Sequence, residues 1–501
     1  MKDRHHYDLL VVGGGVNGTG IARDAAGRGL KVLLVEANDL ASATSSISTK
    51  IIHGGLRYLE QFEFRLVAEA LKEREILLKN APHIMWPLEF ILPHTKELRP
   101  AWMIRLGLFL YDHLSKRKIL AGSRSVSMNE GVYDAPLKDY IKKGFSYADG
   151  WVDDARLVAL NAVSAKEKGA TILTYTKCAS IKQDMDGACW RAQIKASVGG
   201  AVEQEISCDA VVNAAGPWVD GFLEHVDGIQ KAKYHIRLVK GSHMIVPRLY
   251  DGEHCYILQN TDNRITFAIP YEQQYTLIGT TDVAYDGDPA AVQISAEEID
   301  YLCDATNRYF KKQISKEDMI ASYSGVRPLL DDGEGNASKV TRDYKLAMQD
   351  IALPFLTVYG GKITTYRKLA EAAVDLLAER MQKEAKGWTQ KEPLPGGDIK
   401  VSFKEFVAQK RAQYPWLPDA VLVRYAHSYG TRMDMIIENA SSLEELGENF
   451  GEGVYVSEID YLIHNEFART LEDIIWRRSK LILHISQTTQ DRIARYLGKT
   501  V

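Results

Sequence analysis

Short apolar runs and longer amphipathic segments alternate in the first part of the chain. Residues 7–12 form an apolar run that stops at three glycines, residues 13–15. Residues 16–28 place small and apolar side chains on one side of a helix, and residues 31–35 form a second apolar run that ends at Glu36. This order predicts a strand, a turn, a helix and a second strand, which together make a dinucleotide-binding βαβ unit.

Each glycine of this turn has a predicted role in binding a nucleotide. Gly13 permits the tight turn, Gly15 lets the backbone approach a pyrophosphate, and Gly18 lets the helix pack closely on the strand. The amides and the dipole of the helix start, beside Gly14 and Asn17, attract the phosphate charge. The acid that ends the second strand is expected to accept a hydrogen bond from a ribose hydroxyl. An ordinary glycine-rich turn is the alternative, but strand, helix and acid in register favour a nucleotide.

Later segments extend this pattern and add a second kind of sheet. Residues 153–168 have helical composition, and the apolar run 210–213 ends in the small residues Ala215 and Gly216. A buried strand that ends in small residues beside the first strand lets a cofactor lie across its carboxyl end. Residues 240–282 instead show short alternating runs, which predict an antiparallel sheet that could cover a substrate pocket.

A second glycine turn, at Gly360 and Gly361, repeats the opening plan and is followed by a helix that runs towards Met381. If this turn returns to the cofactor, the amides near Lys362 and Thr364 start a helix whose positive end stabilises negative charge on a reduced isoalloxazine. A nicotinamide gains no such charge, so we expect FAD rather than NAD.

Hydroxyl side chains and another glycine pair add candidate cofactor contacts between residues 43 and 59. The candidates are Ser45, Ser46, His53, Gly54, Gly55 and Leu56. A plain surface loop is the alternative for the hydroxyl-rich run, and a simple turn is the alternative for each glycine pair. Together with the first turn, these segments favour a flavin.

The predicted fold class is α/β, with a Rossmann-like FAD-binding domain, an interleaved antiparallel-sheet substrate domain and a C-terminal helical domain. Residues 1–390 are expected to form the FAD-binding domain with its interleaved sheet, which is strongest around residues 240–350. The sequence KEPLPGGD, residues 391–398, is interpreted as a linker because it holds two prolines and two glycines. Residues 391–501 then form the helical domain.

Composition narrows the class of protein further. A chain of 501 residues with 46% hydrophobic residues can bury an extensive core, and its net charge of −4 gives no general attraction to nucleic acid. The five cysteines are odd in number and never spaced as CxxC, so we expect no disulfide framework, no metal site and a reducing cytosol. The first strand begins near residue 7 and no apolar stretch reaches about 20 uncharged residues, so we expect neither a signal peptide nor a membrane span.

A series of motifs between about residue 7 and residue 372 resembles one enzyme family. In order, they are GGGVNGTGIARDAAGRGL, LASATSSISTKIIHGGLRYLE, YDHLSKRK, WVDDARL, NAAGPWV, KGSHMIVP, IGTTD, YSGVRPL, TRDY and GGKITTYRKLAE. They resemble the FAD-dependent glycerol-3-phosphate dehydrogenases of the respiratory, quinone-linked kind. The glycine motifs alone belong to a broad flavoprotein superfamily that includes amino-acid oxidases, whereas HGGLRYLE, YSGVRPL and GGKITTYR in series are much more specific.

The resemblance implies oxidation of sn-glycerol 3-phosphate to dihydroxyacetone phosphate in glycerol metabolism, with electrons passing from FAD to a membrane quinone. It also implies a cytoplasmic protein in peripheral contact with lipid at the inner face of the cell membrane, and suggests a homodimer. The alternatives are a glycerol-3-phosphate oxidase that uses oxygen, although such oxidases carry an insertion not seen here, and another amine or amino-acid oxidase of the superfamily.

The implied substrate is a phosphate dianion with a secondary alcohol, so its pocket needs cations. We assign Arg57, Arg342 and Lys362 to the phosphate, and Arg327 to the hydroxyl, where it would stabilise a developing alkoxide or hold a water. For Arg342 the alternative is an ion pair with its neighbour Asp343. This group of cations favours a phosphate over the carboxylate of an amino acid.

The reaction also needs a proton acceptor for the hydroxyl. His243 is the most natural base because the unperturbed pKa of histidine lies near neutral pH. His53 and Tyr58 are the alternatives, and Tyr58 is also assigned to the substrate.

Residues 99–118 combine apolar and aromatic residues with basic residues at both ends. They are too short to span a bilayer, and Arg105 interrupts the apolar part. A short amphipathic helix of this kind can lie in the headgroup layer, with Lys116, Arg117 and Lys118 near anionic lipid. A buried core helix with a solvated basic end is the alternative.

Overall fold

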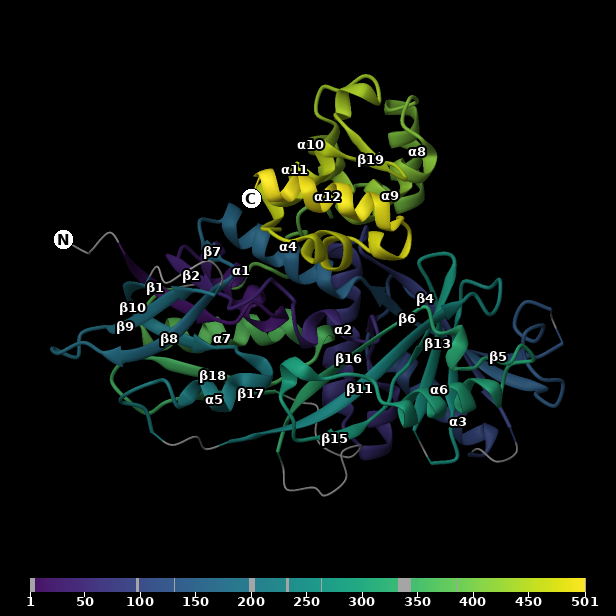
Figure 1. Cartoon of the computed structure of the whole chain (residues 1–501). Coiled ribbons are helices and arrows are strands. Elements are labelled where there is room, and N and C mark those ends of the chain that lie inside the picture. Colours follow the sequence, from purple (N-terminus) through teal and green to yellow (C-terminus); the bar gives the residue numbers. More distant parts are fainter. Residues whose placement is uncertain are drawn as a thin grey trace.

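The computed structural model describes residues 5–95, 99–129, 131–197, 203–230, 234–262, 264–331, 344–384 and 386–500. Two large sheets lie side by side, and the C-terminal helices cover one edge of the pair (Figure 1). Segments from both halves of the chain alternate between the two sheets, so neither sheet is formed by one continuous stretch of sequence.

The first sheet has a parallel centre in the order β18-β10-β1-β2-β7. The bounds of these strands are β1 His6–Val12, β2 Val32–Val35, β7 Thr171–Leu173, β10 Glu203–Asn213 and β18 Phe355–Gly360. The antiparallel strands β8 Thr176–Gln183, β9 Trp190–Ala196 and β17 Tyr344–Met348 complete it. Apolar side chains fill both faces of β1 and β2, which is typical of a parallel sheet with both faces covered.

Helix α1 Val16–Gly27 packs against both α4 Asp154–Glu167 and α7 Tyr366–Arg380, and α1 and α7 share an apolar core with one face of this sheet. Asp153 caps α4 by accepting a hydrogen bond from the amide of Arg156. The predicted strand-turn-helix-strand unit at the start of the chain is therefore confirmed, as is the helix predicted over residues 153–168.

The second sheet has ten strands, in the order β15-β11-β14-β13-β12-β4-β6-β3, with β16 beside β11 and β5 beside β6. The strands are β3 Ile51–Ile52, β4 Met85–His94, β5 Arg124–Ser127, β6 Lys143–Val152, β11 Ile236–Pro247, β12 Cys255–Gln259, β13 Ile265–Tyr271, β14 Tyr275–Gly279, β15 Val283–Tyr285 and β16 Ala321–Leu330. Its strands from residues 51–152 extend it well before the region expected from the sequence, and β12 pairs with β4 in parallel.

Four further helices accompany the sheets: α2 Phe64–Asn80, α3 Ala101–His113, α5 Val219–Leu223 and α6 Ala296–Asn307. The C-terminal region contains α8 Phe403–Gln413, α9 Asp419–Tyr429, α10 Met433–Ile437, α11 Val456–Glu466, α12 Gln487–Thr500 and the hairpin of β19 Asn449–Gly451 and β20 Val454–Tyr455. These elements share an apolar core of their own. The segment interpreted as a linker is well anchored, because the amide of Leu394 donates to the Asn80 carbonyl at 2.9 Å and Leu394 is buried.

Candidate active site

A cavity of about 2110 Å³ lies where the two sheets meet. Pockets for single small molecules typically measure about 300–1,000 Å³, so this cavity has room for a dinucleotide and a second, smaller ligand. Its wall combines the β1–α1 turn, the end of β2, residues 41–58, the end of β10 and the turn after β18. The carboxyl ends of the parallel strands β1, β10 and β18 therefore meet at one side of the cavity, which is where cofactors bind in this class of fold.

The first glycine turn has the geometry that its sequence predicts. Gly13 has a φ of 113°, which side chains other than glycine rarely adopt. A Cβ atom on Gly18 would overlap the carbonyl oxygen of Gly13, so α1 can approach the turn only with glycine there. Gly15 and Asn17 line the cavity, and the amide of Val16 donates to Ser45 Oγ at 3.0 Å.

Glu36 lines the cavity and also holds the glycine turn. Its Oε2 accepts from the Gly14 amide at 2.6 Å and its Oε1 accepts from the Asn38 amide at 2.8 Å. Burial raises the pKa of this carboxyl group, and the two amide hydrogen bonds oppose that shift. Each carboxylate oxygen can accept more than one hydrogen bond, so Glu36 can hold the turn and still accept from a ribose hydroxyl.

The second glycine turn lies next to the first, because Asn17 Nδ2 donates to the Gly360 carbonyl at 3.2 Å. Gly361 has a φ of 107° and lines the cavity together with Lys362, which precedes the helical turn η6 Ile363–Thr365 at the start of α7. Thr364 is buried behind this wall, where its Oγ1 accepts from the His53 amide at 3.1 Å. That hydrogen bond holds the His53 segment against the second turn, so both segments face one cavity.

Three predicted substrate ligands meet in this wall. Arg57, Tyr58 and Lys362 all line the cavity, and Lys362 Nζ lies 3.9 Å from the centroid of the Tyr58 ring. A cation so close to the face of an aromatic ring is held by a cation–π interaction. The tyrosine ring therefore holds the lysine ammonium group beside the cavity, where Nζ itself is buried.

Arg327 lines the cavity from β16, and its guanidinium group forms an ion pair with Asp282. Its Nη2 also donates to Thr280 Oγ1 at 2.8 Å. The sequence prediction did not include Asp282 or Thr280, although both lie in the motif IGTTD and line the cavity. The run of polar residues directly after an apolar strand was the signal that could have identified them.

His243 lies behind the cavity wall. It is buried in β11, where its Nε2 lies 3.0 Å from Thr49 Oγ1 and its ring stacks on Tyr323 at a centroid distance of 4.8 Å. Thr49 lines the cavity, so its hydroxyl connects the imidazole to the cavity. Burial, aided by the charges of Arg327 and Lys50, lowers the pKa of His243 well below 6.5. The unperturbed pKa used in the sequence argument therefore does not apply.

The structure brings most of the predicted site residues to one cavity. Its wall includes Gly13, Gly15, Asn17, Glu36, Ser45, His53, Gly55, Leu56, Arg57, Tyr58, Ala215, Gly216, Arg327, Gly361 and Lys362. Within the described part of the chain, the wall does not include Gly14, Gly18, Ser46, Gly54, His243 or Thr364. Arg342 lies outside the described residues.

Two of the residues outside the wall have clear structural partners instead. The Ser46 hydroxyl donates to the Ala43 carbonyl within its own turn, at 3.4 Å. The Gly54 amide donates to the Tyr111 hydroxyl at 2.8 Å. These two residues therefore shape the segments that carry Ser45 and Gly55.

Comparisons with protein families agree with this architecture. The family described as FAD dependent oxidoreductase matches residues 8–367, and the family described as C-terminal domain of alpha-glycerophosphate oxidase matches residues 387–500. The first match covers both sheets, and the second covers the C-terminal helices.

Individual relatives extend over nearly the whole chain. A glycerol-3-phosphate dehydrogenase of Pseudomonas aeruginosa is 52% identical over 98% of this chain and 95% of its own. A D-erythritol 1-phosphate dehydrogenase of Brucella abortus is 49% identical over 97% of each chain. The solved structure of the glycerol-3-phosphate dehydrogenase from Bacillus halodurans, complexed with FAD, matches 99% of this chain and 91% of its own, with a TM-score of 0.79 and 29% identity.

Proposed function

The chain belongs to the family of FAD-dependent glycerol-3-phosphate dehydrogenases, and we propose that it oxidises sn-glycerol 3-phosphate to dihydroxyacetone phosphate and delivers the electrons to a membrane quinone. The observation that carries this proposal is that Arg57, Arg327 and Lys362, three of the basic residues in the cavity wall, line the same cavity as a dinucleotide turn. A phosphate dianion is the ligand that such a group binds best.

The residues of the cavity fit FAD. Gly13 and Gly15 leave backbone exposed at the start of α1, where a pyrophosphate is stabilised by the helix amides and dipole. Among the described residues, the buried Oδ1 of Asn17 has no hydrogen-bond partner, and it lies in the cavity wall between the two glycine turns. Bound FAD supplies the acceptor for the two electrons taken from the alcohol carbon.

The three cations divide the work of binding the substrate in this proposal. Arg57 and Lys362 bind the phosphate, because they approach from the two segments that the hydrogen bond from the His53 amide to Thr364 holds together. Arg327 comes from a different element, β16, and is assigned to the reacting hydroxyl. Its ion pair with Asp282 fixes the guanidinium plane, so the remaining donor hydrogens point in a defined direction.

We propose His53 as the residue that accepts the hydroxyl proton, because it lines the cavity while His243 does not. In the competing arrangement the proton passes to His243 through the Thr49 hydroxyl. Replacing each histidine with asparagine separates the two. His53→Asn is expected to abolish the ascending limb of the pH profile of kcat/KM. His243→Asn is expected to change the value of kcat/KM without removing that limb. The reverse result would assign the proton to the Thr49 relay.

The function is tested by anaerobic reduction of the bound flavin. The purified protein is expected to lose its visible absorption when glycerol 3-phosphate is added without oxygen, and to be reoxidised by a soluble quinone faster than by oxygen. No bleaching by glycerol 3-phosphate would exclude the dehydrogenase activity, and fast reoxidation by oxygen with peroxide formation would indicate an oxidase.

D-Erythritol 1-phosphate is a second candidate substrate, because the Brucella relative named for it is nearly as similar as the glycerol-3-phosphate relative. It shares the phosphate but is one carbon longer. Comparing the flavin reduction rates with the two polyol phosphates at equal concentration decides between them. We expect glycerol 3-phosphate to react faster; a faster reaction with D-erythritol 1-phosphate would change the assigned substrate.

We propose that α3 provides peripheral contact with lipid at the inner face of the cell membrane. Its solvent side exposes Trp102, Leu106 and Phe109, which are 65%, 50% and 49% accessible, and Phe62 of the adjoining segment is 78% accessible. An exposed apolar face of this kind suits the headgroup region of a bilayer. Arg99 and Ala101, at the start of α3, line the cavity, so this orientation would bring the cavity close to the lipid that dissolves the quinone.

Of the basic residues after α3, Lys116 and Lys118 are exposed, whereas Arg117 is partly buried. The helix ends at His113, and Arg117 forms an ion pair with Asp112 at 2.7 Å. The apolar face and the two exposed lysines are therefore the candidates for lipid contact. None of the helices in the described ranges combines the length and the hydrophobicity needed to cross a bilayer. The expected homodimer stays a prediction, which light scattering of the purified protein tests.

A further inference from the structure

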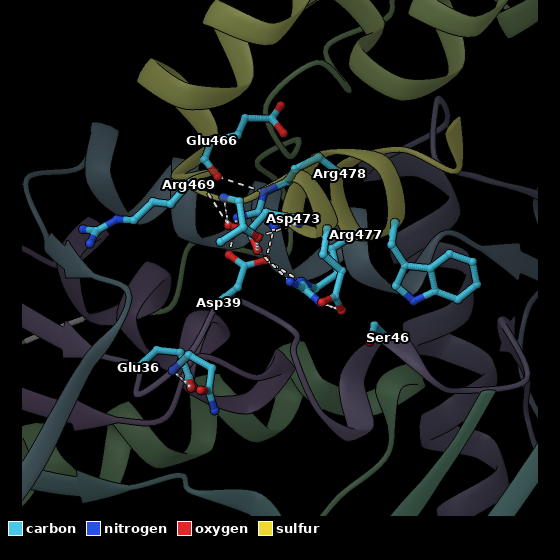
Figure 2. A network of polar contacts seen from close by, with 12 residues as sticks. Glu36, Asp39, Ser46, Glu466, Arg469, Asp473, Arg477 and Arg478 are labelled. Atoms are coloured by element: carbon cyan, nitrogen blue, oxygen red, sulfur yellow. Dashed lines mark hydrogen bonds and ion pairs between the residues drawn. The ribbon is translucent and has the colours of Figure 1, made fainter. Parts of the chain in front are cut away.

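A cluster of buried charges connects the C-terminal domain to the loop that follows β2 (Figure 2). Asp39 lies three residues after Glu36 and is 1% exposed. Its Oδ2 accepts from Arg477 Nε at 2.6 Å and from Arg478 Nη1 at 2.7 Å, and its Oδ1 accepts from Arg478 Nη2 at 2.7 Å. Two consecutive arginines of one domain thus bind a single carboxylate of the other.

The two arginines are held in place by a π-helical turn, Asp473–Arg478. Arg477 also binds Asp473 at 2.6 Å, and Arg478 donates from Nε to the Glu466 carbonyl at 2.9 Å. Asp473 in turn accepts from the Tyr175 hydroxyl at 2.8 Å. Single π-helical turns occur frequently at functional sites, and this one presents both guanidinium groups to the same carboxylate.

The bound loop touches the first glycine turn in three places. The Glu36 carboxylate accepts from the Gly14 amide at 2.6 Å, and the Ala41 amide donates to the Gly14 carbonyl at 3.2 Å. The Leu40 side chain packs against Gly14, since a Cβ atom built there would lie 3.0 Å from Leu40 Cδ2. Asp39 is therefore the anchored centre of a loop whose two ends shape the adenosine side of the cavity.

We propose that Arg477 and Arg478 of the C-terminal domain are positioning residues for FAD: by binding Asp39 they hold Glu36 and the glycine turn in the geometry that retains the adenosine half of the cofactor. Neither arginine nor Asp39 belongs to the cavity wall among the described residues, so the effect passes through the loop. This inference rests on the FAD site of the proposed function and is independent of which polyol phosphate is oxidised.

The physical reason is the cost of a buried charge that loses most of its partners. Loss of Arg478 removes two of the three arginine hydrogen bonds of Asp39, which drives this carboxylate towards water or towards protonation. Either change moves the loop between Glu36 and Ala41. Glu36 and the glycine turn would then no longer be held in place before FAD binds. Part of the binding free energy of FAD would be used to order them, and the affinity would fall.

The test is a titration of the full-length protein, stripped of FAD, with FAD and with ADP, which occupies only the adenosine half. Arg478→Met is expected to raise the dissociation constants for FAD and for ADP by a similar factor of about ten or more. Arg478→Lys, which keeps the charge but loses the paired hydrogen bonds, is expected to lie between Arg478→Met and the unchanged protein. With saturating FAD, the KM for glycerol 3-phosphate is expected to stay unchanged.

Arg424 provides a matched control, because it forms an ion pair with the buried Glu458 inside the C-terminal domain. Arg424→Met is expected to lower thermal stability without weakening ADP binding. The double variant Asp39→Asn with Arg478→Met is expected to lose no more ADP affinity than Arg478→Met alone, because the two substitutions remove the same interaction. ADP binding that is unchanged in Arg478→Met and in Arg478→Lys, or weakened equally by Arg424→Met, would overturn the proposal.

Discussion

Replacing Lys362 with methionine tests directly whether the second glycine turn binds the substrate phosphate. Methionine keeps most of the length of the side chain and removes the charge. A charge-assisted hydrogen bond to phosphate contributes about 1.5–3 kcal/mol, which corresponds to a rise of roughly 10- to 150-fold in the dissociation constant for glycerol 3-phosphate. The loss is expected in substrate binding, because the phosphate is bound equally in the ground state and the transition state.

Replacing Tyr58 tests the position of Lys362 indirectly, because the tyrosine ring holds the lysine ammonium group. Lys362 Nζ lies 3.9 Å from the ring centroid, and a cation–π contact contributes about 0.5–2 kcal/mol. Tyr58→Phe keeps the ring face, so Lys362 should stay in place. Tyr58→Leu removes the ring and is expected to weaken substrate binding by roughly 2- to 30-fold.

The assay is a titration of substrate binding, followed through the flavin spectrum, together with KM and kcat measured with a dye acceptor. Reduction by a small artificial donor without a phosphate serves as the reference reaction, and Lys362→Met should leave it nearly unchanged. A change of less than about threefold in glycerol 3-phosphate binding would refute the assignment to the phosphate. Equal losses with both donors would place Lys362 on the flavin instead.

Three further predictions concern cofactor retention, stability and membrane binding. Gly15→Val is expected to give a protein that is folded by circular dichroism but shows no FAD absorbance. A Cβ atom at this position meets only Ser45 Oγ, at 3.1 Å, so the fold tolerates it, whereas the two methyl groups of valine would occupy the space of the pyrophosphate. A yellow variant would contradict this. Burial lowers the pKa of His83 from 6.5 to about 3, so its contribution to stability is complete above pH 6.5 and is lost as the pH falls towards 3. Between pH 6.5 and 5 the free energy of unfolding should fall by about 1.6 kcal/mol on this account, and His83→Gln should remove that part in denaturant titrations. Replacing Trp102 and Leu106 with glutamate should reduce sedimentation with anionic vesicles while dye-linked activity persists, and unchanged sedimentation would exclude this face of α3.

The features that could be predicted from the sequence are local ones. The β1–α1–β2 unit follows from apolar runs that end at glycines, and the packing of Gly18 against Gly13 follows from the known geometry of that turn. The fold class and FAD followed from these patterns together with the family resemblance. The assignment of Arg57, Tyr58 and Lys362 to the substrate stays a prediction, although the structure places all three in one wall.

The features that could not be predicted depend on contacts between distant segments. Asp39 and its partner Arg478 are 439 positions apart, and no local pattern indicates that they meet. The ion pair between Arg327 and Asp282 likewise joins two segments that are 45 positions apart in the sequence and meet at the second sheet. His243 shows the same difficulty in its chemistry, because its pKa depends on burial in β11 and on the charge of Arg327.

The interleaved arrangement of the two sheets has a consequence for how the protein is made. β1 pairs with β2 at once, but its other neighbour, β10, brings Ser207 to His6 across 201 positions of sequence. At a synthesis rate of about 5–20 residues per second, β1 waits for roughly 10–40 s before its partner leaves the ribosome. During that time an apolar parallel strand has an open edge, which is a site for mispairing. The nascent chain should therefore depend on chaperones until β10 emerges, and the cofactor cannot bind before β18 completes the second turn.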